Sequence, residues 1–257
     1  MHPMLNIAIR AARTAGDSIV REMDRTRDIS IETKGKNDFV TEVDKNAEGI
    51  IISVIKNAYP EHAFLAEESG QEGENDYLWI IDPLDGTTNF LHGFPHFSVS
   101  IALQNKGVLE QAVIYDPLKQ ELFTASKGKG AQLNNRKIRV SIKNTLDGAL
   151  LGTGFPYNNE SVMQQFIESY KNLFPNVAGI RRAGVASLDL AYVACGRLDG
   201  FWEFNLRPWD IAAGALIIQE AGGINAELTG GADYMKTGNI ISANPKMIKA
   251  MLKVLSK

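Results

Sequence analysis

The sequence is poor in the residues that build disulfides, zinc sites and membrane spans. It contains one cysteine, Cys195, so it excludes an internal disulfide, and such usage is typical of a reducing compartment. It contains only four histidines, which disfavours zinc. No stretch reaches the ~18 consecutive apolar residues of a membrane helix, and residues 1–10 lack the basic and apolar regions of a signal peptide. The net charge of −3 disfavours a general nucleic-acid surface. We therefore expect a soluble, cytoplasmic protein that binds neither membranes nor nucleic acid directly.

An apolar run that delivers two carboxylates, over residues 79–90 (WIIDPLDGTTNF), is the most informative segment. It predicts a buried strand over residues 77–81 that ends at Asp82, with Asp85 three positions on in a turn. Two adjacent carboxylates repel each other unless a proton or a cation lies between them. Gly86 lets a ligand approach the backbone, and the N–H groups of residues 86–88 are able to hold an anion. The segment predicts metal-assisted phosphate chemistry, although Asp-Pro and Asp-Gly steps also form ordinary turns.

The remaining pattern predicts an α+β or layered α/β fold. Residues 28–40 are expected to form a loop or short hairpin. Periodicity of three to four predicts helices over residues 5–23, 41–58, 160–173, 187–194, 208–221 and 245–255. Further strands are expected over residues 63–66, 97–103, 109–115, 121–125, 149–153, 179–182, 198–204, 224–228 and 239–243, with a hairpin over 132–140. The change from meander to alternation predicts two sub-domains in one compact unit, residues 1–145 and 146–257.

Two further acids are expected near the aspartate pair. Glu67 follows the strand over residues 63–66, and neighbouring strand ends lie close together, so Glu67 is expected to join Asp82. Asp210 follows Pro208, which suits a helix start, so Asp210 lies in a first helical turn. The alternative for Asp210 is simple compensation of the helix dipole.

Three other charged residues have both a functional and a structural interpretation. Thr41 and Asp44 fit a capping box, in which Asp44 serves as a cap and also supports the site. Glu203 lies between aromatic residues, either as a substrate contact or as an exposed position of a strand. Lys34 is either a phosphate contact or a solvated surface lysine.

At this point the motifs resemble those of the inositol monophosphatase family. Residues 79–90 resemble its first signature, and residues 209–214, continuing to 220–223, resemble its second. Glu67-Glu68-Ser69 matches the acidic step upstream, and residues 1–8 resemble the bacterial SuhB-like branch. The resemblance covers nearly the whole chain. It implies a layered αβαβα sandwich of the inositol monophosphatase and fructose-bisphosphatase kind.

The resemblance also implies a role for each motif residue. Mg²⁺, with Mn²⁺ able to substitute, would be held by Glu67, Asp82, the carbonyl of Leu84, Asp85 and Asp210. These are all oxygen ligands, which suits a hard cation. Thr87, held by Asp44, would orient the attacking water, and Glu67 would help to deprotonate it. Substrate contacts are implied for Lys34, Asp85, Gly86, Thr87, Gly184, Ala186, Glu203 and Asp210. One departure is Val185, where many members carry Ser or Thr, so that a hydroxyl is missing near the pocket.

The implied activity is Mg²⁺-dependent, lithium-sensitive hydrolysis of inositol 1-phosphate by a homodimer. Other phosphatase chemistries are disfavoured, because Cys195 is followed six positions later by Phe201 rather than Arg, and the acids are spaced Asp-x-x-Asp. A fructose-1,6-bisphosphatase-type sugar phosphatase is one alternative. Another is a SuhB-type role in transcription antitermination and ribosomal RNA synthesis, through contacts with RNA polymerase and Nus factors. A basic surface with Arg181, Arg182 and Arg197 would serve that role, unless these residues form ordinary ion pairs.

Overall fold

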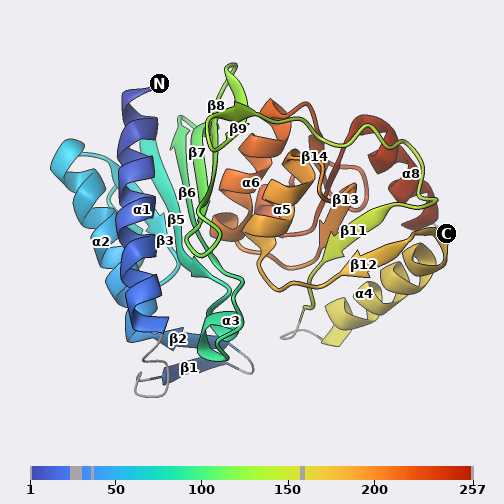
Figure 1. Ribbon diagram of the computed structural model, residues 1–257, viewed down its shortest axis with the longest axis horizontal. Coiled ribbons are helices and arrows are strands. Elements are labelled where there is room, and N and C mark those ends of the chain that lie inside the picture. The colour runs from blue at the N-terminus through green and yellow to red at the C-terminus, as the bar shows by residue number, and fades with distance from the viewer. Residues whose placement is uncertain (1, 24–30, 36–37, 157–159, 256–257) are drawn as a thin grey trace.

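Five layers make up the molecule, in the order helices, sheet, helices, sheet, helices (Figure 1). The computed structural model describes residues 2–23, 31–35, 38–156 and 160–255, with only the backbone described for residues 31–35 and 38–40. The predicted layered αβαβα arrangement is confirmed. Among the described residues, no helix is long and apolar enough to span a membrane.

Two amphipathic helices form the first layer, α1 (Pro3–Met23) and α2 (Glu42–Ala58). Leu5, Ala8, Ala12, Ala15 and Ile19 form the buried face of α1, as their spacing predicts. The predicted capping box at the start of α2 is present. A small antiparallel hairpin, β1 (Ile31–Gly35) and β2 (Asp38–Thr41), leads into α2.

The second layer is an eight-stranded sheet in the order β10-β9-β8-β7-β6-β5-β3-β4. Only β3 and β5 are parallel to each other, and the other neighbours are antiparallel. Its strands are β3 (Ala63–Ala66), β4 (Gly70–Glu72), β5 (Tyr77–Asp85), β6 (Ser98–Asn105), β7 (Val108–Asp116), β8 (Glu121–Ser126), β9 (Gly130–Leu133) and β10 (Arg136–Lys137). The turn between β9 and β10 has positive φ at Asn134 and Asn135, as expected for a tight hairpin.

The middle layer consists of α5 (Ala186–Ala194) and α6 (Pro208–Glu220), which pack against both sheets. Residues 211–218 of α6 are all buried. A helix that is apolar on every side is expected in the interior, and these two helices join the cores of the two sheets.

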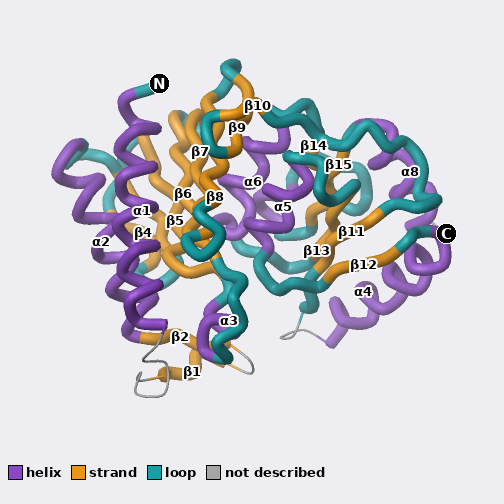
Figure 2. The backbone as a smooth tube through the Cα atoms, in the orientation of Figure 1, coloured by secondary structure: helices purple, strands orange, loops and turns teal. Residues whose placement is uncertain are grey.

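The fourth layer is a five-stranded sheet in the order β12-β11-β13-β15-β14. Its strands are β11 (Leu150–Thr153), β12 (Gly179–Arg181), β13 (Gly200–Glu203), β14 (Ile224–Ala226) and β15 (Ile240–Ala243). Two helices cover its outer face, α4 (Glu160–Leu173) and α8 (Pro245–Leu255), both with the bounds that the sequence predicts. The segment 138–149 connects the two sheets without regular structure (Figure 2). The division of the chain at residue 145 remains a proposal.

Some predicted element bounds and exposures were wrong, because the local sequence pattern does not determine them. The strand predicted to end at Asp82 continues to Asp85, and the turn expected after it is the short helix α3 (Thr87–Leu91). The strand β4 and the short helix α7 (Tyr234–Thr237) were not predicted. Ala58, expected on the buried face of α2, is exposed, because it lies at the end of the helix.

Candidate active site

A bulge in β5 sets the two aspartates of the first motif. Asp82 pairs with Ser100 of β6 and Asp85 pairs with Ser98, so the register shifts between them. Pro83 lies in this interval, where its missing N–H interrupts the ladder. In a regular strand, side chains three residues apart point to opposite faces. The bulge, rather than the predicted turn, brings Asp82 and Asp85 into one electrostatic neighbourhood.

Glu67 reaches the same place through the parallel pairing of β3 and β5. Ala66, the last residue of β3, is paired with Ile81, and the N–H of Glu67 donates to the carbonyl of Ile81 at 3.1 Å. The carboxyl of Glu67 lies close enough to that of Asp82 to help raise its pKa. The predicted meeting of the two strand ends is confirmed.

Asp85 connects the first motif to the middle helices. Its Oδ2 accepts from the backbone N–H of Ser187 at 2.8 Å and from the hydroxyl of Ser187. Ser187 lies in the first turn of α5, and Val185, which precedes that helix, provides no side-chain cap. Asp85 therefore caps α5 across 102 residues of sequence.

Asp210 lies in the first turn of α6, as predicted, and accepts from the N–H of Arg207 at 2.7 Å. Burial, together with the charges of Asp85 and Glu203, raises the pKa of Asp210 well above its usual value. Dipole compensation alone does not explain this position, because the residue is also a neighbour of the other acids.

The acids lie close enough together that their negative charges repel one another. Burial and the charges of Glu67, Asp85 and Asp210 raise the pKa of Asp82 well above its usual value. Burial also raises the pKa of Asp85 to about 6, against the hydrogen bonds from Ser187. Buried carboxylates in such proximity are stabilised by a cation.

The donor set fits a hard cation such as Mg²⁺, because every ligand candidate is an oxygen. In the described part of the chain, no three His, Cys, Asp or Glu side chains already form a ready-made metal cage. The protein instead holds each aspartate by its own donors: Asp82 accepts from the N–H of Leu84 at 3.1 Å, Asp85 from Ser187 and Asp210 from Arg207.

Beside the carboxylates, the backbone offers donors to an anion. Among the described residues, the N–H groups of Gly86 and Thr87 have no hydrogen-bond partner. Gly86 has φ of +101°, and a Cβ there would lie 2.9 Å from Cγ2 of Val185 and 3.2 Å from the carbonyl oxygen of His96. Only glycine fits this turn without strain.

A chain of hydrogen bonds orients the hydroxyl of Thr87. That hydroxyl lies 2.8 Å from Oδ1 of Asp44 and 3.1 Å from the carbonyl oxygen of Leu84. The other carboxylate oxygen of Asp44 accepts from the N–H of Thr41 at 2.8 Å and from the hydroxyl of Thr41. Asp44 is therefore both the predicted cap of α2 and the partner of Thr87.

These groups face a cavity of about 270 Å³. Its lining includes the predicted site residues Glu67, Asp85, Gly86, Thr87, Gly184, Ala186, Glu203 and Asp210. Asp82 and Leu84 lie buried beneath it. Lys34 belongs to β1, and its side chain lies outside the described part of the chain.

Glu203 enters this cavity because residue 154 is glycine. A Cβ on Gly154 would lie 1.9 Å from Oε1 of Glu203. Burial and the charges of Asp189 and Asp85 raise the pKa of Glu203 well above its usual value. The interpretation of Glu203 as an exposed strand position is therefore wrong, because its side chain is only partly accessible and lines the cavity.

Val185 does not line the cavity. It is fully buried and lies behind the backbone of Gly86. A hydroxyl at position 185 would therefore lie against the turn at Gly86 and outside the lining of the cavity.

Sequence reasoning did not assign four residues to the site: Ser187, Asp189, Phe155 and Arg182, the last of which was expected on a basic surface. Ser187 holds Asp85, and Asp189 is buried beside Asp85 and Arg182. Phe155 and Arg182 line the cavity, with the guanidinium 4.8 Å from the ring centroid. No local motif marks them, because each acts through contacts that only the fold creates.

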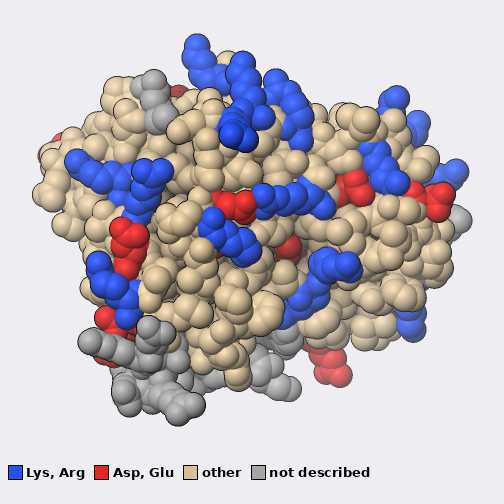
Figure 3. All heavy atoms as spheres, viewed as in Figure 1, with Lys and Arg blue, Asp and Glu red and all other residues tan. Residues whose placement is uncertain are grey.

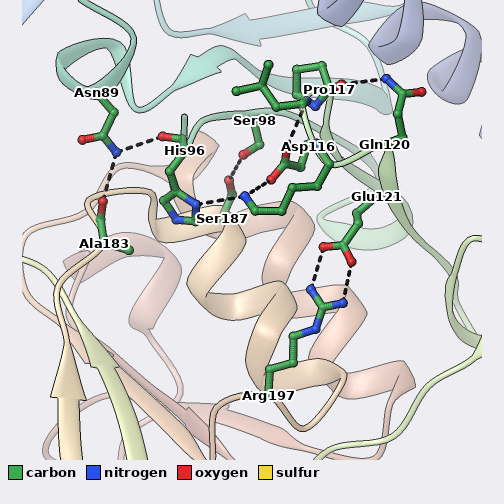
Figure 4. Close-up of polar contacts among 12 residues, drawn as sticks. Asn89, His96, Ser98, Asp116, Pro117, Gln120, Glu121, Ala183, Ser187 and Arg197 are labelled. Atoms are coloured by element: carbon green, nitrogen blue, oxygen red, sulfur yellow. Dashed lines mark hydrogen bonds and ion pairs between the residues drawn. The ribbon is translucent and has the colours of Figure 1, made fainter. Parts of the chain in front are cut away.

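Hydrogen bonds beside the site connect α3 and β6 to the segment that leads into α5 and to α5 itself (Figure 4). The Asn89 amide donates to the carbonyls of His96 and Ala183 at 2.9 and 3.0 Å. The hydroxyls of Ser98 and Ser187 lie 2.8 Å apart. Arg197 forms a bidentate ion pair with Glu121, so this part of the predicted basic surface has the ordinary structural interpretation.

Comparison with known proteins agrees with the fold. The model of the inositol monophosphatase family matches residues 1–257. A Pseudomonas aeruginosa protein named Nus factor SuhB is 54% identical, with 98% of this chain and 95% of that protein covered. The solved structure of the extragenic suppressor protein suhB from Bartonella henselae has a TM-score of 0.97 and 43% identity, covering 100% of this chain and 99% of its own. The inositol monophosphatase of Anabaena has a TM-score of 0.89 and 38% identity, covering 98% and 95%.

Proposed function

The chain belongs to the inositol monophosphatase family, and from this premise we propose that it is a magnesium-dependent phosphomonoesterase that hydrolyses inositol 1-phosphate. The observation that carries the proposal is that groups suited to a cation lie next to groups suited to an anion. Carboxylates from β5, α6 and the end of β3 lie beside the free N–H groups of Gly86 and Thr87. A cation and a phosphate require this combination at adjacent positions.

The residues that would hold Mg²⁺ are Glu67, Asp82, Asp85, Asp210 and the carbonyl oxygen of Leu84, and Mn²⁺ is able to replace it. When bound, the metal supplies positive charge that polarises the phosphate and lowers the pKa of a water molecule. Asp82 lies deepest of the four acids and has the other three as electrostatic neighbours, so it is the ligand whose loss matters most.

The chain's own groups then orient the reaction. A hydroxyl has one proton, and Thr87 directs it to Asp44, the nearer acceptor. The lone pairs of Thr87 are left to accept a hydrogen bond from the attacking water and so orient it. Glu67 lines the cavity and is placed to receive a proton from that water. The N–H groups of Gly86 and Thr87 hold the phosphate in line.

The rest of the cavity selects a small polyol. Its volume of about 270 Å³ admits one ring and a phosphate. Glu203 accepts hydrogen bonds from ring hydroxyls, and Gly184 and Ala186 leave room beside it. A fructose-1,6-bisphosphatase-type activity is the competing substrate choice.

Phosphate release from a substrate panel tests the proposal. The panel contains inositol 1-phosphate, fructose 1,6-bisphosphate, histidinol phosphate and adenosine 3′,5′-bisphosphate, each with Mg²⁺, with EDTA and with added Li⁺. We expect Mg²⁺-dependent, Li⁺-sensitive release that is fastest from inositol 1-phosphate. Faster phosphate release from another compound would reject inositol 1-phosphate as the substrate. No phosphate release from any of the four compounds would reject the phosphatase activity.

A second function is favoured by the name of the 54% identical relative, Nus factor SuhB. We propose contacts with Nus factors and RNA polymerase as this alternative role, in which catalysis is incidental. The double variant Asp82→Asn, Asp85→Asn separates the two. Rescue of a strain that lacks the gene would assign the essential role to partner binding, and failure of a folded double variant would assign it to catalysis.

We also propose a homodimer in the cytoplasm, on the family resemblance and the single cysteine. Sedimentation equilibrium at micromolar concentration tests the assembly: a mass twice that of the 28.2 kDa chain is expected, and the mass of one chain would refute it.

A further inference from the structure

A second cavity, of about 470 Å³, lies away from the carboxylates, between the N-terminus of α1 and the strands β7, β8 and β9. No residue lines both cavities. The candidate active site lies where β5 ends and β6 begins, whereas Gln111 of this cavity is paired with Leu103 near the other end of β6. In Figure 1 the start of α1 and the hairpin after β8 lie at the top, and α3 lies at the bottom.

The cavity is rich in positive charge. Lys127 and Lys129 line it, and no aspartate or glutamate does. Within the described part of the chain, neither lysine forms an ion pair. Lysine and arginine side chains gather at this end of the molecule, over the strands β8 to β10 (Figure 3).

The loop that carries the two lysines is held in place from behind. The carboxylate of Glu220 accepts from the N–H groups of Gly128 and Gly130, both at 2.7 Å. The N–H of Lys127 donates to the carbonyl of Glu110, and that of Lys129 to the carbonyl of Ser126, both at 2.9 Å. The backbone under both lysines is therefore fixed before any ligand arrives.

The start of α1 adds the positive end of a helix dipole rather than a row of free donors, because Pro3 has no N–H and the N–H groups of Met4 and Asn6 already donate to His2. This 21-residue helix has no acidic residue in its first turn, so the positive end of its dipole is uncompensated by its own side chains. His2 Nδ1 accepts from the N–H of Met4 at 3.3 Å. His2 also lines the cavity.

Two buried polar side chains in the wall have unused hydrogen-bonding capacity. Gln111 is 4% exposed and Thr124 is 5% exposed. The Gln111 amide forms one side-chain hydrogen bond among the described residues, with Ser126, so one of its two polar atoms has no partner whichever way the amide is turned. The hydroxyl of Thr124 has none within the same residues. The unpaired atoms of both side chains are open to the cavity rather than sealed in the core, so they are available to an occupant.

We propose that this cavity is a second ligand site, which binds a small phosphate monoester with an aromatic body. The oxygens of a phosphate match the two ammonium groups, and the positive end of the α1 dipole lies beside them. The volume is within the range of small-molecule sites and exceeds the need of inorganic phosphate. Leu5, Ala125 and the aliphatic parts of the lysines provide apolar surface for the ring, and Gln111 and Thr124 bind its polar edge.

Calorimetric titration in EDTA measures ligand binding to the second cavity under conditions in which metal-dependent hydrolysis does not occur. The probes are phenyl phosphate, adenosine 5′-monophosphate and uridine 5′-monophosphate, with inorganic phosphate for comparison. The variants are K127E/K129E, which reverses the charge of the cavity, and Thr124→Val, which removes one hydroxyl. R136E/K137E is the matched control, because it makes the same charge change on β10, outside the lining. Asp82→Asn reports on the candidate active site.

We expect at least one ester to bind wild type, R136E/K137E and Asp82→Asn with equal affinity, and more tightly than inorganic phosphate. K127E/K129E should weaken binding by about tenfold or more, and Thr124→Val by roughly two- to tenfold. The proposal is overturned if no ester binds, if K127E/K129E binds as the control does, or if Asp82→Asn alone changes the affinity. Circular dichroism checks that each variant is folded. Failure here leaves the phosphatase proposal untouched, because no turnover is measured.

Discussion

Replacement of Gly86 by alanine should destabilise the protein by an amount that depends on Val185. An L-residue at φ of +101° costs about 1–3 kcal/mol. The added Cβ would also lie 2.9 Å from Cγ2 of Val185, 3.2 Å from the His96 carbonyl oxygen and 3.3 Å from Cβ of Phe97. Overpacking of this kind costs about 1–3 kcal/mol. We therefore expect Gly86→Ala to lower the free energy of unfolding by about 2–6 kcal/mol.

A double-mutant cycle with Val185→Ala separates the two causes. Val185→Ala removes the nearest contact but leaves the backbone strain, so Gly86→Ala should cost about 1 kcal/mol less in that background. Urea unfolding in EDTA, followed by the fluorescence of the buried Trp79 and Trp202, measures both values. If Gly86→Ala unfolds within about 0.5 kcal/mol of wild type, the requirement for glycine is refuted. Equal costs in both backgrounds would refute the contact with Val185.

Three further predictions concern side chains around the site. Ser187→Ala should lower the free energy of unfolding by about 1–2 kcal/mol, because the hydroxyl that donates to Asp85 is lost. An unchanged urea-unfolding free energy would show that this hydrogen bond contributes nothing to stability. Burial lowers the pKa of His96 from 6.5 to about 4, so the unfolded chain takes up its proton first and stability falls as pH falls from about 6.5 to 4. His96→Gln should reduce this loss by roughly 1–3 kcal/mol, and an unchanged pH profile of the thermal midpoint would contradict the assignment. Gly154→Ala should displace the Glu203 carboxylate and raise KM for inositol 1-phosphate about tenfold or more with a smaller effect on kcat, whereas unchanged kinetics would remove Glu203 from the substrate site.

The parts of the fold that local sequence determines were predictable. The helices over residues 160–173 and 245–255 have the expected bounds, because a strong apolar periodicity coincides with an acidic start or a proline. The capping box of Thr41 and Asp44 needs only four consecutive residues. The middle helices were also found, although their apolar character on every side gives no orientation.

Long-range contacts were not predictable. The bulge that extends β5 to Asp85 depends on pairing with β6, and the α5 cap by Asp85 joins residues 102 positions apart. Both alter how the motif is understood, since Asp85 is a structural cap as well as a candidate ligand. Val185 illustrates the same limit: its chemistry was noted from sequence, but its place behind Gly86 follows from packing alone.

The candidate site was therefore predictable as a set of residues and not as a geometry. The acids were found because carboxylates follow strands and begin a helix. Glu203 was ambiguous, because the gap at Gly154 that admits its carboxylate lies on a neighbouring strand end.

The turnover of Asp82→Asn, measured together with its stability, tests the central claim most directly. The exposed Asp233→Asn is the matched control, since it makes the same chemical change far from the cluster. At saturating Mg²⁺, Asp82→Asn should release phosphate from inositol 1-phosphate about 10³-fold or more slowly, a barrier increase of about 4 kcal/mol. In EDTA it should be at least as stable as wild type, because asparagine places no ionisable group among the three remaining acids while its Oδ1 still accepts from Leu84. Near-normal turnover by folded Asp82→Asn would contradict the account.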